Sequence, residues 1–132
     1  MENLDIIGSR NFNDDTILEK VLLEIVSIEG LPKNVVSGGA KGADTLGFVW
    51  AKKNNIDTIL FEPKYKDFPK KVRKWMAPKE RNTSIVENSD IIVAFWDMSS
   101  TGTKDTMDKS IKNNKKVYLY NVIENKLSLY ND

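Results

Sequence analysis

The stretch Val35-Val36-Ser37-Gly38-Gly39-Ala40-Lys41-Gly42-Ala43-Asp44 joins a short apolar run to a helical pattern through a glycine-rich turn. Glycine reaches backbone angles that other residues avoid, and it lets another molecule approach the main chain closely. A strand that turns directly into a helix leaves unpaired N–H groups at the positive end of the helix dipole. The stretch therefore predicts an anion site, and phosphate is the commonest anion at such a turn.

The composition excludes several kinds of chemistry. The chain has 132 residues, which suits one domain with one core, so we treat residues 1–132 as a single domain. It contains no cysteine and no histidine, which excludes disulfides, thiolate or histidine metal sites, and Ser-His-Asp or Cys-His catalysis. We expect no metal and no required cofactor. The sequence has neither a signal-peptide pattern nor an apolar run of about 20 residues, so we expect a cytoplasmic protein with no membrane partner.

Apolar runs alternate with helical patterns along the whole chain. The runs predict strands near residues 4–7, 34–37, 57–61, 90–95 and 116–120, and the tail offers a short further edge strand with Leu127 and Leu129. Helical patterns lie near residues 14–28, 44–54, 79–88 and 103–114. This alternation predicts an α/β fold, a Rossmann-like three-layer sandwich with a parallel sheet of about five strands (order 3-2-1-4-5) and helices on both faces.

The segment of residues 64–81 is strongly basic. Eight lysines and arginines against two acidic residues give it a charge of +6, which leaves −5 for the remainder of a chain whose formal charge is +1. Two prolines predict a loop with a short helix, and we expect a solvated surface with Trp75 packed inward. Single-stranded nucleic acid is an alternative partner because aromatic and basic residues are interleaved. The residues that would carry this binding are Lys70, Lys71, Arg73 and Lys74.

Several motifs fall on one edge of the predicted sheet. Ligands of such folds bind beyond the carboxyl ends of the strands, where the winding reverses. Gly8-Ser9-Arg10, the glycine turn and Ser99-Ser100-Thr101-Gly102-Thr103 all follow strands. The hydroxyls of the last motif suit phosphate or ribose, although simple N-capping is the alternative. Glu62 stands where dinucleotide folds place a ribose-binding acid, but we interpret it as a surface carboxylate.

Together these motifs resemble the SLOG superfamily, which includes the LOG enzymes and the Smf/DprA DNA-processing proteins, and in particular its short single-domain YspA/YpsA-like branch. The resemblance runs from about residue 5 to residue 120. It implies a Rossmann-like fold that binds nucleotides or nucleotide-derived small molecules, and a homodimer. The residues that carry it are Gly8-Ser9-Arg10, Ser37-Gly38-Gly39-Ala40-Lys41-Gly42-Ala43-Asp44, Glu80-Arg81-Asn82, Asp90 and Ser100-Thr101-Gly102-Thr103.

LOG-type members of the superfamily cleave the N-glycosidic bond of nucleoside monophosphates. The spacing of Arg81 and Asp90 fits their pattern, but Thr106 stands where their catalytic glutamate belongs. A hydroxyl cannot act as a general base as a carboxylate does. We therefore expect a binding protein. A nucleotide N-glycosidase is the alternative, with Arg81, Asp105 and Asp44 as its candidate catalytic residues.

The main hypothesis is a module that senses or sequesters a nucleotide-like signal, for example in phage–bacterium conflict. Main-chain N–H groups of the glycine turn and of Gly102-Thr103 would hold phosphates, and two arginines would neutralise charge. Asp44 and Ser9 would take ribose hydroxyls, and Trp96 would stack on a base. DNA binding of the DprA type is the second alternative. The expected ligand-binding residues are Gly8, Ser9, Arg10, Ser37, Gly38, Gly39, Ala40, Lys41, Gly42, Ala43, Asp44, Arg81, Asn82, Trp96, Ser99, Ser100, Thr101, Gly102 and Thr103.

Overall fold

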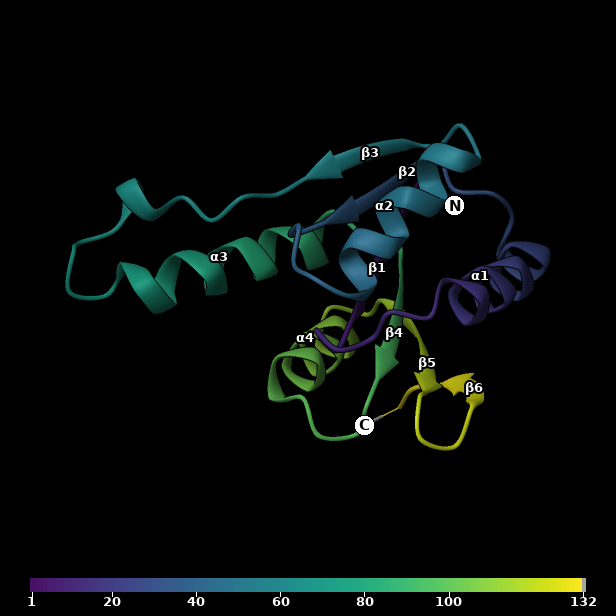
Figure 1. Cartoon of the computed structure of the whole chain (residues 1–132). Helices are drawn as coiled ribbons and strands as arrows, with labels where there is room; N and C mark the ends of the chain where they lie inside the picture. The colour runs from purple at the N-terminus through teal and green to yellow at the C-terminus, as the bar shows by residue number, and fades with distance from the viewer. Residues whose placement is uncertain (132) are drawn as a thin grey trace.

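The protein is built on a single six-stranded sheet. A computed structural model describes residues 1–131 and gives the strand order β3-β2-β1-β4-β5-β6 (Figure 1). Neighbours from β3 to β5 pair in parallel, and β6 pairs antiparallel with β5. The strands are β1 (Asn3–Gly8), β2 (Asn34–Ser37), β3 (Asp57–Leu60), β4 (Ile91–Trp96), β5 (Lys116–Asn121) and β6 (Lys126–Leu129).

The predicted order of the first five strands is confirmed. The sheet has six strands rather than about five, because the tail adds one antiparallel edge strand, β6. β6 follows β5 through a tight turn rather than a helix. The Asn121 side chain accepts hydrogen bonds from the backbone N–H groups of Ile123 and Glu124, and Asn125 takes a positive φ of 53°. This turn chemistry reverses the chain within a few residues, which only an antiparallel pairing allows.

Helices cover both faces of the sheet, as predicted. On one face, alternate residues of β1 and β4 pack against α1 and α2, and Leu4, Ile6, Val93 and Phe95 are fully buried there. On the other face, Ile92 and Ala94 pack against Met107 of α4. β4 is therefore buried along its whole length, as a central parallel strand should be. The helices are α1 (Asp15–Glu29), α2 (Ala43–Lys53), α3 (Arg73–Glu87) and α4 (Thr101–Lys112), with a short 3-10 helix, η1 (Tyr65–Asp67).

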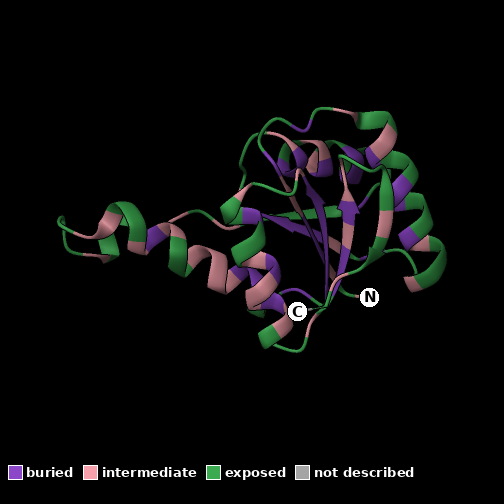
Figure 2. Cartoon of the chain, turned by 90° about the horizontal axis from the view of Figure 1, so that it is seen from below, coloured by how far each residue is buried: buried purple, intermediate pink, exposed green. Residues whose placement is uncertain are grey.

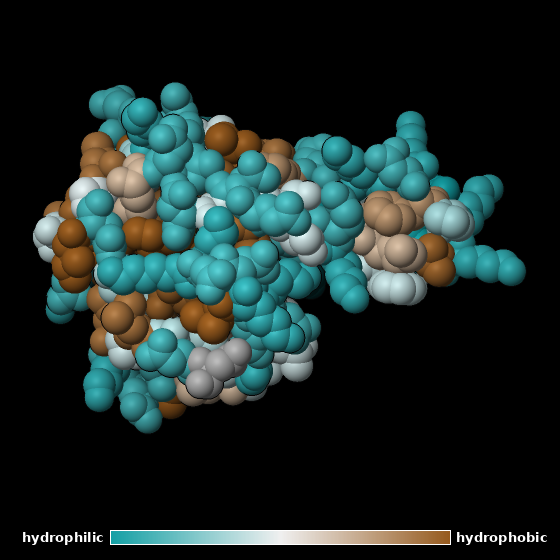
Figure 3. Space-filling view, turned by 180° about the vertical axis from the view of Figure 1, so that it is seen from behind, coloured by the Kyte–Doolittle hydropathy of each residue, from teal (hydrophilic) through white to brown (hydrophobic). Residues whose placement is uncertain are grey.

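Residues 64–79 form a basic arm that projects from the domain. It consists of η1 and the first half of α3, which lies beside η1 and runs back to the sheet (Figures 1 and 3). Figure 2 shows that buried residues gather in the sheet and on the helix faces against it, whereas the arm is exposed or half-buried along most of its length. No helix within residues 1–131 has the length and apolar character that a membrane crossing requires.

The arm corrects two expectations. α3 begins at Arg73 rather than near residue 79, and it continues through Pro78, which has no N–H to donate within the helix. Trp75 is 57% exposed instead of packed inward, since the first turns of α3 have no sheet beneath them.

Candidate functional site

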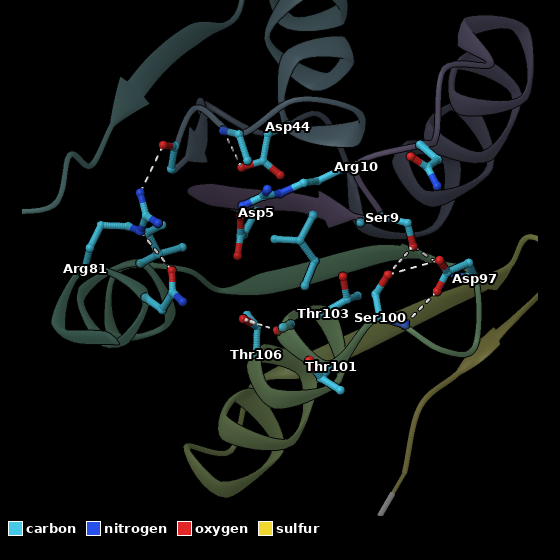
Figure 4. Close-up of a pocket in the computed structure, with 18 residues that line it drawn as sticks. Asp5, Ser9, Arg10, Asp44, Arg81, Asp97, Ser100, Thr101, Thr103 and Thr106 are labelled. Carbon is cyan, nitrogen blue, oxygen red and sulfur yellow. Dashed lines mark hydrogen bonds between the residues drawn. The ribbon is translucent and has the colours of Figure 1, made fainter. Parts of the chain in front are cut away.

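A cavity of about 570 Å³ opens at the carboxyl edge of the sheet. Its walls come from β1 and the loop after it, the glycine turn, the middle of α3, the loop after β4 and the first turns of α4 (Figure 4). The motifs that the sequence assigned to this edge do converge. The predicted site residues that line the cavity are Gly8, Ser9, Arg10, Gly38, Ala40, Asp44, Arg81, Asn82, Ser100, Thr101, Gly102 and Thr103.

Other predicted residues lie outside the cavity wall. Trp96 is 7% exposed, packs in the core beside α4 and donates a 2.9 Å hydrogen bond from Nε1 to the backbone oxygen of Ser100, so the prediction that it stacks on a base is wrong. Asp105 and Glu62 are exposed and do not line the cavity. The remaining predicted residues outside the lining are Ser37, Gly39, Lys41, Gly42, Ala43 and Ser99.

Two N–H groups of the glycine turn, those of Gly39 and Ala40, already have acceptors inside the protein. Ser37 Oγ accepts from the N–H of Gly39 at 3.0 Å and donates to Asp44 Oδ2 at 2.9 Å, and Asp44 Oδ2 also accepts from the N–H of Ala40 at 3.4 Å. Burial raises the pKa of Asp44, while the hydrogen bonds from Ser37, Ala40 and Gly38 and the charge of Arg81 oppose this rise. Ser37 and Asp44 thus bind two of the N–H groups that the sequence assigned to a ligand phosphate.

The Arg81 guanidinium lies against the same turn. Its Nη1 donates a 3.1 Å hydrogen bond to the backbone oxygen of Gly38, and its Nε donates a 2.8 Å hydrogen bond to Asn82 Oδ1. A Cβ atom at position 38 would lie 2.8 Å from Nη1. A side chain at position 38 would therefore displace the guanidinium from this turn, and Arg81 presents its charge at the cavity wall.

A network of hydroxyls and one carboxylate joins the loops after β1 and β4. Asp97 Oδ1 accepts from the N–H groups of Ser99 and Ser100 at 2.9 and 2.8 Å, and Oδ2 accepts from Ser100 Oγ at 3.0 Å. Ser9 Oγ accepts from the N–H of Asp97 at 3.1 Å. The backbone hydrogen bonds from Ser99 and Ser100 lower the pKa of Asp97 to about 2. The network fixes the position of the first turn of α4.

The amino end of α4 faces the cavity without a side-chain cap. Ser100 is its N-cap residue, but the Ser100 hydroxyl bonds Ser9 and Asp97 instead of the helix. Thr101, Gly102 and Thr103 of the first turn line the cavity. The first N–H groups of a helix need an acceptor, and the helix dipole favours a negative one. Of the two turns that the sequence proposed for phosphate, this is the one whose helix has no side-chain acceptor at its amino end.

Asp5 is the functional candidate that the sequence reasoning missed. It lies in the middle of β1, lines the cavity and has 0% exposure. Among the residues that the structure describes, neither carboxyl oxygen of Asp5 has a hydrogen-bond partner. Burial raises its pKa well above the ordinary value, and the charge of Asp44 raises it further. The sequence did contain a signal for this residue. Asp5 interrupts the apolar run Leu4-Asp5-Ile6-Ile7, and a central strand with helices on both faces buries every position of such a run.

Other lining residues were also absent from the predicted set. Thr106 lies in the cavity, where its Oγ1 donates a 3.1 Å hydrogen bond to the backbone oxygen of Gly102. The further lining residues are Ile7, Asn11, Ile85 and Asp97. Asp90 lies at the opposite edge of the sheet, where its Oδ2 accepts from the N–H groups of Glu2 and Asn3, so its role is structural. The described part of the chain contains no cluster of acidic side chains suited to a metal ion.

Comparison with known proteins agrees with this fold. The chain resembles the X-ray structure of DNA processing protein A (DprA) from Streptococcus pneumoniae with a TM-score of 0.67 and 20% sequence identity. The similarity covers 90% of this chain and 50% of that chain, so this chain spans half the length of DprA. At this identity the likeness concerns the fold. A search of curated proteins found no match.

A family model gives the more specific result. The model described as "YspA, cpYpsA-related SLOG family" matches residues 6–68, which include the loop after β1, the glycine turn and the start of the basic arm. Residues 6–68 thus carry the pattern of the YspA and cpYpsA-related SLOG family on a DprA-like fold, which confirms the resemblance inferred from the motifs.

Proposed function

We propose that the cavity binds a nucleotide or a nucleotide-derived small molecule and holds a phosphate at the amino end of α4. The observation that carries the proposal is the uncapped first turn of α4, which opens into a cavity of about 570 Å³ at the carboxyl edge of the sheet. A cavity of this size is ordinary for a small-molecule site. Helix amino ends are common phosphate sites.

Each wall of the cavity has a separate part in this proposal. The N–H groups and hydroxyls of Thr101 and Thr103 bind the phosphate, and Arg81 and the exposed Arg10 supply positive charge. Ser9 and Asp44 offer acceptors for sugar hydroxyls. The glycine turn shapes the cavity and places Asp44, and its Gly39 and Ala40 N–H groups are bound by Ser37 and Asp44.

The proposal favours binding over hydrolysis. Thr106 lines the cavity at the position that resembles that of the LOG glutamate, and it carries no charge. Asp105 is exposed outside the wall, so an N-glycosidase would have to rely on Arg81 with Asp44. Incubation with nucleoside monophosphates at high protein concentration should release no free base. Release that Arg81→Ala abolishes would support the hydrolase instead.

Position 102 offers a matched test of the phosphate site. A Cβ atom at Gly102 meets nothing within 4 Å, so a longer side chain can be accommodated there. Gly102→Glu adds a carboxylate beside the helix end, and Gly102→Gln adds the same bulk without charge. Calorimetry with nucleoside 5′-monophosphates should show affinity at least about tenfold lower for the glutamate variant than for the glutamine variant. The corresponding nucleosides should bind wild-type protein weakly and discriminate little between the variants.

Two results would overturn the nucleotide proposal. One is equal, millimolar or weaker binding of wild-type protein to every nucleotide tested. The other is equal affinity of both Gly102 variants for the monophosphates. We further propose that the protein is cytoplasmic. We also propose, from the family resemblance, that it forms a homodimer. Light scattering on the purified protein tests the oligomeric state.

The basic arm supports a second candidate function, the binding of single-stranded DNA. Trp75 and Tyr65 are 57% and 44% exposed, and they share the arm with the lysines of residues 64–79. Exposed aromatic rings stack on bases while basic side chains neutralise the backbone. The fold resembles that of a protein named for DNA processing. This candidate uses a surface away from the cavity, so the two functions can be tested separately.

A further inference from the structure

A second hollow lies along the basic arm and shares no lining residue with the cavity at the sheet edge. Its volume is about 410 Å³, and it lies between the loop after η1 and one face of α3. Figure 3 shows apolar atoms in the middle of the arm, ringed by hydrophilic side chains. The residues that line the hollow are Phe68, Trp75, Met76, Lys79, Glu80 and Thr83.

Hydrogen bonds hold both walls of this hollow in place. Arg73 Nη2 donates a 3.0 Å hydrogen bond to the backbone oxygen of Phe68, and the backbone N–H of Arg73 donates to the backbone oxygen of Pro69 at 3.0 Å. At the end nearer the sheet, Lys109 Nζ of α4 donates a 3.2 Å hydrogen bond to Thr83 Oγ1. The hollow is therefore formed before any partner arrives, which lowers the ordering cost of binding.

The surroundings of the hollow favour a negatively charged polymer with flat apolar faces. Trp75 is exposed, and the other apolar lining side chains are half-buried, so apolar surface is left for a partner. Residues 64–81 carry eight basic and two acidic side chains, a charge of +6. This charge would repel the arm of a second copy, whereas a nucleic acid strand brings a phosphate with every base. Charge and shape together therefore fit a strand whose bases are free to enter the hollow.

We propose that the hollow takes one unstacked base of single-stranded DNA, with the base ring against Trp75 and the flanking phosphates near the lysines of the arm. This inference rests on the second candidate function, DNA binding by the arm. It adds the place where a base is held and separates the part of the hollow from that of the lysines. Every base has a flat π-face, so the site accepts all four bases.

The hollow and the lysines act on different quantities. A base in a duplex is covered by its neighbours and paired at its edge, so it must be extruded before it can enter the hollow, and extrusion costs free energy that a single strand largely avoids. Phosphates are available to lysines in either form of DNA. The lysines therefore set the affinity and its salt dependence, and the hollow with Trp75 sets the preference for an accessible base.

A charge-matched pair of strands tests this division. One is a short single strand, and the other is an abasic strand of the same length, which carries the same phosphates without bases. Fluorescence anisotropy at low salt measures both affinities. Trp75→Ala removes the ring, and Trp75→Phe keeps one. A Lys70→Gln, Lys71→Gln, Lys74→Gln variant removes charge outside the hollow, and Leu23→Ala, at an exposed apolar position of α1, is the control.

Wild-type protein and the Leu23→Ala control should bind the strand with bases at least about fivefold more tightly than the abasic strand, as one base stacked on an aromatic ring allows. Trp75→Ala should lose most of this ratio, and Trp75→Phe should keep most of it. The lysine variant should bind both strands more weakly and keep the ratio. A duplex should bind more tightly when one of its bases is left unpaired, and this gain should vanish in Trp75→Ala.

The failures of the two proposals differ. If wild-type protein binds neither strand at low salt, DNA binding by the arm and this assignment are both overturned. Equal affinity for the two strands, or an unchanged ratio in Trp75→Ala, overturns the role of the hollow alone. Binding to vesicles of anionic lipid without binding to either strand would assign the arm to a membrane surface instead. Loss of a dimer in Trp75→Ala with an unchanged ratio would assign the hollow to a second copy of this chain.

Discussion

The Ser37 hydroxyl donates a 2.9 Å hydrogen bond to Asp44 Oδ2, and this contact ties the end of β2 to the first turn of α2 across the glycine turn. Both residues are buried, at 0% and 8% exposure. Each also accepts a hydrogen bond from a backbone N–H of the turn. Serine and aspartate therefore hold a conformation that three glycines alone would leave loose.

Removing this contact should destabilise the protein. Ser37→Ala leaves the N–H of Gly39 without its acceptor and removes one of the two donors to Asp44 Oδ2, and we expect the free energy of unfolding to fall by about 1–3 kcal/mol. Urea denaturation followed by circular dichroism measures the change. Ser99→Ala is the control, because the exposed Ser99 side chain makes no comparable buried contact, and it should stay within about 0.5 kcal/mol of wild type.

Asp5 should make the protein less stable as pH rises. Its pKa in the folded state lies well above that of the unfolded chain, because burial disfavours the charged form. Between the unfolded pKa of about 4 and the folded pKa, the folded state holds a proton that the unfolded state has lost, so stability falls by about 1.4 kcal/mol per pH unit. Asp5→Asn should flatten this part of the pH–stability curve. Parallel curves for the two proteins would contradict the buried acid.

Asp97 should act in the opposite direction. Its pKa is lowered to about 2 by backbone hydrogen bonds from Ser99 and Ser100, so its contribution is complete above the unfolded pKa of about 4 and is lost as pH falls through 2. Asp97→Ala should cost about 1 kcal/mol at neutral pH, because it removes the acceptor of the Ser99 and Ser100 N–H groups. The difference from wild type should shrink in acid. A difference that is the same at pH 6 and at the acid end would rule out this account.

Two glycines of the cavity region should respond very differently to alanine. Gly42 has φ of 85°, and a Cβ atom there would lie 2.5 Å from the backbone oxygen of Ser9. Gly42→Ala should lower the free energy of unfolding by about 2 kcal/mol or more, since both the backbone angle and the contact are unfavourable. Gly102→Ala has open space in the first turn of α4 and should be neutral or slightly stabilising. Thermal denaturation of the pair provides the comparison.

The arm should report DNA binding through one tryptophan. Of the three tryptophans, Trp50 and Trp96 are 7% exposed and Trp75 is 57% exposed, so quenching by a soluble quencher or by a stacked base should come mainly from Trp75. Single-stranded DNA at low salt should quench this signal, and Trp75→Phe should abolish the change. Affinity should fall steeply with salt and in a Lys70→Glu, Lys71→Glu, Lys74→Glu variant. Unchanged affinity in that variant would exclude the arm as the DNA site.

The sequence predicted the parts of the fold that depend on local pattern. The strand order followed from alternating apolar runs and helical spacing, and the shared edge of the sheet brought the loops after β1, β2 and β4 together as expected. It could not predict which partner each polar group chooses. The N–H of Ala40 binds Asp44, and Trp96 packs in the core, because these choices depend on how the folded chain brings the groups together.

Asp5 and the arm show two further limits. The spacing of Asp5 in an apolar strand does not predict that both of its carboxyl oxygens lack hydrogen-bond partners among the described residues. That outcome depends on the side chains that surround Asp5 in the fold, including Val36 and Ile92 of the neighbouring strands. The prolines at 69 and 78 predicted a break, yet α3 continues through Pro78.

Because η1 and the first half of α3 project away from the sheet, they bury little surface against the rest of the domain, and substitutions there should cost little folding stability. A substitution in β1 or at Gly42 disturbs two layers of the domain together. The arm and the cavity can therefore be altered by substitution independently of one another.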